Sequence, residues 1–226
     1  MEELKRQAAI AALDGINNGM IVGLGSGSTA SLFIRELGGL VRAGLRILGI
    51  PSSEDSRRLA EEVGIPLTTL LDHPSIDVTV DGADEVSDRL DLTKGLGGAL
   101  VREKIVAHAS RRVVIVVDET KLVDQLGRKA PIPVEVIPLA SALIQTQLER
   151  WGGEARPREK GGKVFMSDNG NLILDWRRGV VDQPAALEKQ LKSLTGVVDS
   201  GIFANVASVV IVATSTGIRK LQRPVS

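Results

Sequence analysis

The chain has 226 residues, enough for one large domain or two small ones, and its lack of cysteine excludes disulfides, thiolate zinc sites and cysteine nucleophiles. Lys plus Arg (28) balances Asp plus Glu (28), and no apolar run approaches membrane-spanning length, so we expect a soluble cytoplasmic protein with neither a nucleic-acid nor a membrane partner. With no tyrosine and only two histidines, His73 and His108, an enzyme of this composition would transfer protons mainly through carboxylates, lysines or water.

The first 130 residues alternate strand and helix patterns, which is typical of a parallel sheet with crossover helices. Apolar runs predict strands at 20–25, 45–50, 76–80 and 113–117. Helical periodicity and capping residues predict helices at 4–16, 29–37, 54–64 and 99–109, and Gly38-Gly39 is expected to stop the second of these.

From residue 131 the pattern changes to β-α-β-β-α-β, which is typical of a ferredoxin-like unit. Its predicted elements are strand 134–137, helix 139–151, a hairpin of 163–166 with 172–176 around Asn169-Gly170, helix 184–194 and strand 196–203. A last apolar strand, 209–213, is assigned to the first sheet because the small unit is already complete. The sequence therefore predicts an α/β protein with a Rossmann-like, mainly parallel sheet domain (1–130 plus 204–226) and a smaller inserted ferredoxin-like α+β domain (131–203).

The segment GLGSGSTA (23–30) lies between a predicted strand and helix. Glycines let a backbone approach a ligand, and N–H groups at a helix start face an anion. The hydroxyls of Ser26, Ser28 and Thr29 suit a phosphate monoester better than a pyrophosphate. The segment also fits a dinucleotide-binding fingerprint, but the acidic residue expected about 20 positions later is missing. A glycine-rich turn with a hydroxyl cap is the alternative.

Asp81-Gly82-Ala83-Asp84 follows an apolar strand, and ligands of open α/β sheets bind at such strand ends. The two small residues allow a tight turn that aims both carboxylates into one cleft. The carboxylates could bind sugar hydroxyls, relay a proton or hold Mg²⁺. A solvated turn with a helix-capping aspartate explains the segment equally well.

A second glycine-rich segment, 94–98, leads into the helix predicted at 99–109. The apolar residues that mark the buried side of this helix are Leu100, Ile105 and Val106. Glu103 lies on the flank of this apolar stripe, while Arg102 and Lys104 are expected to point outward. Partial removal from water would make Glu103 a better base, although an ordinary surface charge is the more common case.

Two lysines lie next to these segments. Lys94 is the first residue of the second glycine-rich segment and could bind a phosphate or an enolate. Lys121 follows the strand predicted at 113–117 and could reach the same sheet edge. Exposed lysines of a turn or a helix start are the alternative for both.

Together these segments resemble the type A ribose-5-phosphate isomerase family. The stretches that keep the family's order and spacing are GLGSGSTA (23–30), SSEDS (52–56), VDGADEV (80–86), KGLGGALVREKIVA (94–107), DETKLVDQLG (118–127), PVEVIP (133–138), DNGN (168–171) and GVVDSGIFA (196–204). VDGADE followed by KGxGGALxxEK is far more specific than any glycine motif. The sequence departs from the pattern at Leu96, where many relatives have glycine, so the backbone there could present its N–H differently.

The resemblance implies an enzyme that interconverts D-ribose 5-phosphate and D-ribulose 5-phosphate through a cis-enediolate, in the non-oxidative pentose phosphate pathway, with no metal or organic cofactor. It implies that Glu103 is the base, that Asp81 and Asp84 handle the hydroxyls, and that Lys94 is the cation beside the enediolate. The substrate-binding residues that it implies are Ser26, Gly27, Ser28, Thr29, Asp81, Gly82, Ala83, Asp84, Lys94, Gly95, Leu96, Gly97 and Lys121. It also implies a homodimer or higher homo-oligomer.

Two other functions stay open from the residues alone. A nucleotide-cofactor oxidoreductase would use the glycine turn at 25–30 and would bind a cofactor that absorbs light. A non-catalytic sugar-phosphate-binding protein would bind the ligand without turnover. Fold alone does not separate these functions from isomerisation.

Overall fold

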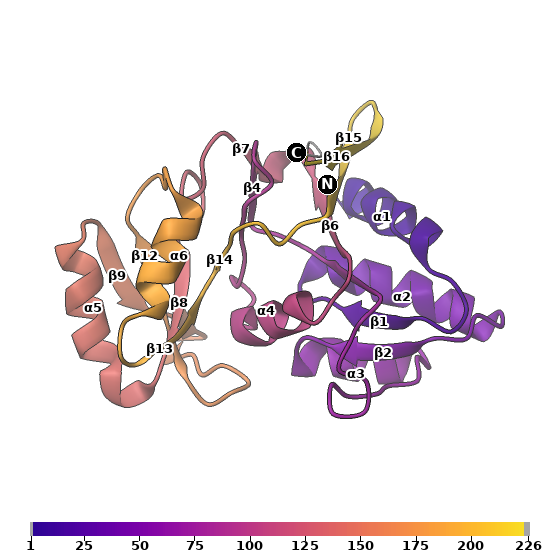
Figure 1. Ribbon diagram of the computed structural model, residues 1–226, viewed down its shortest axis with the longest axis horizontal. Coiled ribbons are helices and arrows are strands. Elements are labelled where there is room, and N and C mark those ends of the chain that lie inside the picture. Colours follow the sequence, from indigo (N-terminus) through magenta and orange to yellow (C-terminus); the bar gives the residue numbers. More distant parts are fainter. Residues whose placement is uncertain (1, 224–226) are drawn as a thin grey trace. The chain divides into compact units, whose positions relative to one another are not determined.

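The computed structural model describes residues 2–223, and the chain forms two compact units (Figure 1). The first unit contains Met1–Ala83, Arg102–Lys121 and Val206–Ser226, and the second contains Asp84–Val101 and Leu122–Asn205. Within the described residues, no helix is both long and apolar enough to cross a membrane.

The first unit is built on a six-stranded sheet with strand order β16-β15-β6-β3-β1-β2. Its strands are β1 (Ile21–Leu24), β2 (Leu48–Pro51), β3 (Val78–Asp81), β6 (Val113–Asp118), β15 (Val209–Thr214) and β16 (Gly217–Gln222). All neighbours are parallel except β15 and β16, which form an antiparallel hairpin at one edge. The last apolar strand therefore joins the first sheet, as predicted. The strand β16 was missed because its residues are mostly polar and exposed.

Helices cover both faces of this sheet. They are α1 (Glu2–Ala11), α2 (Ser28–Arg42), α3 (Glu54–Glu62) and α4 (Leu100–His108), with short 3-10 turns η1 (Leu13–Gly15) and η2 (Glu119–Lys121). The helices α1 and α2 lie side by side on one face (Figure 1). On the other face, Val106 of α4 packs with Ile50 and Ile76.

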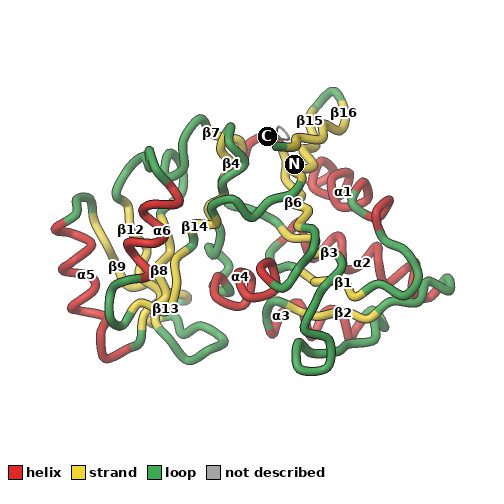
Figure 2. Tube along the Cα trace, in the orientation of Figure 1, coloured by secondary structure: helices red, strands yellow, loops and turns green. Residues whose placement is uncertain are grey.

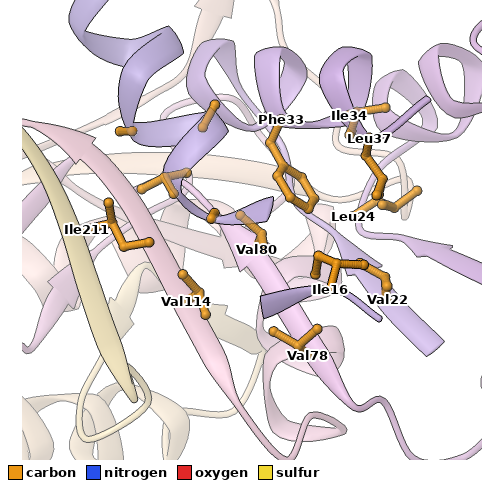
Figure 3. Close-up of a cluster of buried hydrophobic side chains, with 14 of the residues drawn as sticks. Ile16, Val22, Leu24, Phe33, Ile34, Leu37, Val78, Val80, Val114 and Ile211 are labelled. Carbon is orange, nitrogen blue, oxygen red and sulfur yellow. The ribbon is translucent and has the colours of Figure 1, made fainter. Parts of the chain in front are cut away.

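The helix α2 supplies much of the buried core. Its residues Phe33, Ile34 and Leu37 are completely buried and belong to the same apolar cluster as Leu24 and Val80 (Figure 3). Successive side chains of a strand point to opposite faces of the sheet, and Leu24 of β1 and Val80 of β3 lie on the face that α2 covers.

The predicted stop of α2 at Gly38-Gly39 is wrong, because the helix continues to Arg42. A Cβ atom at Gly38 would lie only 2.5 Å from the Cγ2 atom of Val63. The glycine at position 38 therefore provides space for the chain that follows α3, and it does not end the helix.

The second unit contains an antiparallel sheet with strand order β13-β8-β12-β9 (Figure 2). Its strands are β8 (Ile132–Val136), β9 (Glu154–Pro157), β12 (Leu172–Arg177) and β13 (Val197–Ser200), and its helices are α5 (Ser141–Arg150) and α6 (Pro184–Lys192), with the 3-10 turn η3 (Pro138–Ala140) before α5. This order of elements is the predicted β-α-β-β-α-β pattern. Trp176, Leu148 and Leu191 are completely buried in its core.

The predicted partner of β12 in the hairpin is wrong. The strand β9 pairs with β12, whereas β11 (Lys163–Val164) pairs with β10 (Glu159–Lys160) in a separate ribbon. Only Ala155 of β9 is buried, so its sequence lacks the apolar alternation that predicts a strand. The turn at Asn169-Gly170 is present, with Gly170 at φ 75° and a single bridge between Met166 and Leu172.

A buried carboxylate holds the turn that precedes β12. Glu135 is fully buried, and its Oε1 atom accepts hydrogen bonds from three side chains: Ser167 Oγ at 2.9 Å, Asn169 Nδ2 at 3.0 Å and Asn171 Nδ2 at 2.9 Å. The stretches PVEVIP and DNGN thus meet in one structural network. Its role is to fix the turn.

A third sheet, in the second unit, has strand order β14-β5-β4-β7. Its short strands are β4 (Glu85–Ser87), β5 (Leu92–Thr93), β7 (Leu122–Val123) and β14 (Ile202–Phe203). Through these strands residues 84–101 and 122–130 pack with the second unit, whereas the predicted domains assign them to the first. The strand predicted at 196–203 is divided between two sheets at Gly201, whose carbonyl accepts the N–H of Lys94 at 2.8 Å.

Candidate active site

In the first unit, the carboxyl end of β3 carries a fixed carboxylate. Asp81 is buried, with 2% of its surface exposed. Its Oδ1 atom accepts the N–H of Ser26 at 2.9 Å and the N–H of Gly82 at 2.7 Å. Hydrogen bonds from N–H groups to an ionised carboxylate are strong and directional. The glycine-rich loop after β1 and the VDGAD segment therefore meet at this sheet edge.

Gly25 makes this meeting possible. Its N–H donates to the carbonyl of Val80 at 3.0 Å, which continues the pairing of β1 with β3. A Cβ atom at position 25 would lie 2.5 Å from the Cα atom of Asp81. Only glycine fits in this space, and the loop lies against Asp81 as a result.

The hydroxyl of Ser26 is held by the start of α3. Its Oγ atom lies 2.9 Å from the Oγ of Ser52 and donates to the Oγ of Ser53 at 2.8 Å. Ser53 is the N-cap of α3, where its Oγ accepts the N–H of Ser56 at 3.0 Å. The SSEDS stretch therefore orients Ser26, a function that the sequence alone did not indicate.

The N-terminus of α2 forms the rest of this loop. Gly27 is the N-cap residue at φ 88°, a conformation that favours glycine, and it is followed by the exposed Ser28 and the buried Thr29. The Nζ atom of Lys5 donates to the Oγ of Ser28 at 3.1 Å. A helix N-terminus with a nearby cation favours an anionic ligand. Sequence reasoning missed Lys5 because only the packing of α1 beside α2 brings it there.

Glu103 lies on α4 and is 5% exposed. The helix is rotated relative to the prediction, because Ile105 is 51% exposed and Lys104 is buried. The apolar pattern gave the wrong rotation because the buried side of α4 includes two charged residues, Glu103 and Lys104, as well as apolar ones. Arg102 is half-buried, and its Nη1 atom donates to the Oε1 of Glu54 at 2.8 Å.

The contact between α4 and α3 has an electrostatic consequence. Hydrogen bonds from Arg102 and Arg57 lower the pKa of Glu54 below its usual value of 4.5. The ion pair of Arg102 with Glu54 links α4 to the start of α3, whereas the pair of Arg57 with Glu54 lies within α3. Lys121 lies in η2, directly after β6, and is half-buried.

The second unit carries the other predicted site residues. The N–H of Asp84 donates to the carbonyl of Thr93 at 2.8 Å, and the Oδ2 of Asp84 accepts the N–H of Leu96 at 3.0 Å. Lys94 is 3% exposed, and its Nζ atom lies 5.5 Å from the ring centroid of Phe203. Asp84 and Lys94 thus belong to one structured loop of this unit.

Two positions of this loop need glycine because of their backbone conformation, and position 96 does not. Gly95 (φ 102°) and Gly98 (φ 93°) adopt a backbone conformation that other residues rarely take. Leu96 lies outside that region and is 42% exposed, so leucine is accommodated without strain and still supplies its N–H to Asp84. Gly97 is also exposed.

Glu85, next to Asp84, has a structural role. Its buried carboxylate accepts the N–H groups of Gly127 at 2.6 Å, Lys129 at 2.5 Å and Ala130 at 3.0 Å. It thereby fixes the loop that follows β7. Within residues 2–223, no group of three or more His, Cys, Asp or Glu side chains is arranged to hold a metal ion.

Comparison with known proteins identifies close relatives over the whole length. Residues 48–217 match the sequence model of the family described as ribose 5-phosphate isomerase A (phosphoriboisomerase A). The ribose-5-phosphate isomerase A of Gloeobacter violaceus is 50% identical over 222 residues, which cover 98% of this chain and 96% of that protein. That of Thermomicrobium roseum is 48% identical over 224 residues, covering 98% and 94%.

Solved structures agree with this relationship. The structure of ribose 5-phosphate isomerase A from Methanocaldococcus jannaschii has a TM-score of 0.94 and 44% identity, and the match covers 98% of this chain and 99% of that one. A D-ribose-5-phosphate isomerase in complex with phospho-erythronic acid has a TM-score of 0.95 and 42% identity, covering 98% and 99%.

Proposed function

Because the chain belongs to the ribose 5-phosphate isomerase A family, we propose that it interconverts D-ribose 5-phosphate and D-ribulose 5-phosphate through a cis-enediolate. The observation that carries this proposal is the similarity over nearly the full chain, which includes every segment that supplies a candidate site residue. The same similarity favours an isomerase over a nucleotide-cofactor oxidoreductase or a non-catalytic sugar-phosphate-binding protein.

The proposed chemistry begins on the open-chain aldose. Glu103 removes the proton from C2, the electron pair forms a double bond between C1 and C2, and the former aldehyde oxygen takes the negative charge. The same carboxyl group then returns the proton to C1, because a cis-enediolate presents one face to the base. The burial of Glu103 on α4 supports this role, since a carboxylate with little water around it is a stronger base.

Other residues must stabilise the negative charge on the enediolate and move the protons of its O1 and O2 atoms. We assign the proton transfers at O1 and O2, and assistance to ring opening, to Asp81 and Asp84. Lys94 stabilises the negative charge that develops on oxygen. The fixed orientation of Asp81 supports its assignment, because its two N–H donors hold the carboxylate in one place.

The remaining predicted residues bind the substrate. The N-terminus of α2, with Gly27, Ser28 and Thr29, suits the phosphate because N–H groups and hydroxyls converge there and Lys5 adds a positive charge. Lys121 is assigned to substrate binding with them. Binding energy from the phosphate, which is remote from C1 and C2, helps to orient the reacting carbons.

Phospho-erythronic acid is bound by one of the relatives, and we expect it to inhibit this protein. Its planar carboxylate resembles the two oxygens of an enediolate, and its phosphate resembles that of the substrate. A competitive pattern against ribose 5-phosphate is the expected result.

The test is a coupled assay with ribose 5-phosphate, run with and without exhaustive chelation. Turnover is expected in both conditions. Glu103→Gln should lower kcat at least ~10²-fold, the low end for loss of a general base, with little change in ligand affinity. Glu62→Gln is the control, because that exposed carboxylate lies on α3 and pairs with Arg35.

Other outcomes would contradict the proposal. Ligand binding without turnover would indicate a sugar-phosphate-binding protein, and cofactor absorbance an oxidoreductase. Activity lost on chelation and restored by Mg²⁺ would reassign the two aspartates as metal ligands. Full activity in Glu103→Gln would remove this residue from the role of base.

Assembly and location are also proposed here. We expect a homodimer or higher homo-oligomer, as the family resemblance implies, and a cytoplasmic location. Light scattering coupled to size exclusion measures the first, and fractionation of the source cells measures the second. A monomer at micromolar concentration would contradict the expected assembly.

A further inference from the structure

The side chain of Arg158, between β9 and β10, makes all of its polar contacts within the second unit. Its Nη1 atom donates to the carbonyls of Gly95 at 2.6 Å and Leu96 at 2.9 Å. Its Nε atom donates to the Oδ2 of Asp175 on β12 at 2.9 Å, and its Nη2 atom pairs with Oδ1 of the same residue. The side chain is 10% exposed. One planar guanidinium thus joins two consecutive carbonyls of a glycine-rich loop to a strand.

The contact to Gly95 reaches Asp84 through a single peptide group. The carbonyl of Gly95 and the N–H of Leu96 belong to the same peptide, and this peptide is trans because the described chain contains no cis bonds. In a trans peptide the C=O and N–H bonds point in opposite directions. The peptide therefore lies between the guanidinium of Arg158 on one side and the carboxylate of Asp84 on the other.

We propose that Arg158 is a positioning residue that orients Asp84 through the Gly95–Leu96 peptide. The inference rests on the proposed function for the role of Asp84 in catalysis. Glycines at positions 95 and 97 flank this short segment, so rotation of the peptide costs little unless something holds it. Arg158 holds it by the carbonyl, and hydrogen bonds in a chain strengthen one another, so the N–H of Leu96 becomes a better donor to Asp84.

The geometry explains why an arginine is required. The four contacts need N–H groups in a fixed plane, two contacts being made to carbonyls and two to a carboxylate. A lysine carries the charge but has a single nitrogen on a flexible chain, so it can keep only part of this arrangement. Asp175 neutralises the guanidinium and fixes its plane.

The test compares Arg158→Ala and Arg158→Lys with Arg156→Ala. Arg156 is the matched control, because it lies two residues earlier on β9, is 75% exposed and pairs with Glu154. Loss of the contact allows a displacement of about 1 Å at Asp84, so kcat for ribose 5-phosphate should fall ~10–100-fold in Arg158→Ala, with KM changed less than about threefold. The kcat of Arg158→Lys should lie between those of Arg158→Ala and wild type. Added guanidinium ion should partly restore the kcat of Arg158→Ala, and should not raise that of Arg158→Lys or Arg156→Ala.

A double-mutant cycle separates positioning from general damage. If Arg158 acts through Asp84, replacing Arg158 in an Asp84→Ala background should change the residual kcat by less than about twofold. An equal loss in both backgrounds would overturn the inference. Activity of Arg158→Ala within twofold of Arg156→Ala would also overturn it.

Hydrogen exchange at the Leu96 amide gives a readout that does not depend on turnover. By NMR, exchange at this N–H should be at least about tenfold faster in Arg158→Ala than in wild type, and unchanged in Arg156→Ala. Unchanged exchange in a folded Arg158→Ala or Arg158→Lys protein would overturn the inference even if the wild type isomerises the substrate. Conversely, a wild type without turnover would refute the proposed function, while the exchange experiment would still decide the role of Arg158.

Discussion

Replacement of Gly25 by alanine tests whether the close contact of β1 with β3 fixes Asp81. The new methyl group would lie 2.5 Å from the Cα atom of Asp81, whereas ordinary contact begins at 3.4 Å. The loop and the strand end must therefore separate by roughly 1 Å. Because the N–H of Ser26 holds the Asp81 carboxylate from the same loop, that hydrogen bond must lengthen or break as well.

Two effects of this displacement are expected, one on stability and one on rate. Inserting a methyl group into a closely packed contact costs about 1–3 kcal/mol of stability. Under the proposed role of Asp81 in proton transfer, a displacement of about 1 Å there should lower kcat for ribose 5-phosphate ~10²-fold. Substrate affinity should change less, because α2, whose N-terminus is assigned to the phosphate, begins three residues after the clash, at Ser28.

The assay measures kcat, KM and the thermal midpoint of Gly25→Ala beside Gly39→Ala. Gly39 is a matched control: it lies inside α2, and a Cβ there would meet nothing closer than 4.0 Å. We expect the control to keep its activity and to gain about 0.5–1 kcal/mol of stability, as for glycine replaced in a helix. Activity of Gly25→Ala within threefold of wild type, with an unchanged midpoint, would refute the reasoning.

Three further predictions concern the mechanism and the stability. In deuterated water, label should enter stereospecifically at C1 of ribulose 5-phosphate, with some internal transfer of hydrogen; a product free of solvent label would indicate a hydride shift and exclude the enediolate. Glu135→Ala should lower the free energy of unfolding by about 1–3 kcal/mol, because the buried hydroxyl of Ser167 and the more exposed amides of Asn169 and Asn171 lose their acceptor, and a thermal midpoint equal to wild type would contradict this. The lowered pKa of Glu54 means that its contact with Arg102 stabilises the fold above about pH 4.5 and is lost as the pH falls through the folded-state value. The midpoint of Glu54→Gln should therefore lie below that of wild type at pH 7 and converge with it under acid conditions; a constant difference down to pH 3 would contradict the assignment.

Much of the fold was predictable because apolar periodicity follows from burial. Five of the six strands of the large sheet were predicted from apolar runs, and two of them, β6 and β15, are runs of valine and isoleucine that are buried along their whole length. Elements with little burial gave no such pattern. The edge strands β9 and β16 are exposed along most of their length, and their sequences contain no apolar alternation.

The errors within helices have a different cause. The prediction for α2 treated two glycines as a stop, but their position inside an apolar helix serves its packing. The prediction for α4 placed Lys104 outward and Ile105 on the buried side, and the structure buries Lys104 and exposes Ile105 instead. A buried charged residue breaks the apolar pattern from which burial is inferred.

The candidate site shows which contacts between residues can be predicted from a sequence and which cannot. The contact of Ser26 with Asp81 follows from a general rule that a sequence can supply, because both residues follow parallel strands and the carboxyl ends of such strands share an edge. Lys5 and Arg158 reach their loops from other elements, at sequence distances of 23 and 62–63 residues from their partners. No local signal marks such residues, because their role depends on which elements pack together.

Leu96 shows that the backbone φ angle decides which positions of this loop need glycine and which tolerate another residue. In the segment Gly95-Leu96-Gly97-Gly98, positive φ values occur at Gly95 and Gly98, where a side chain would be strained. At position 96 the conformation is an ordinary one, and the group that matters is the N–H that binds Asp84. Every residue except proline supplies that N–H. The contact to Asp84 is therefore kept although the side chain differs from the family pattern, because the loop's function at this position belongs to the main chain.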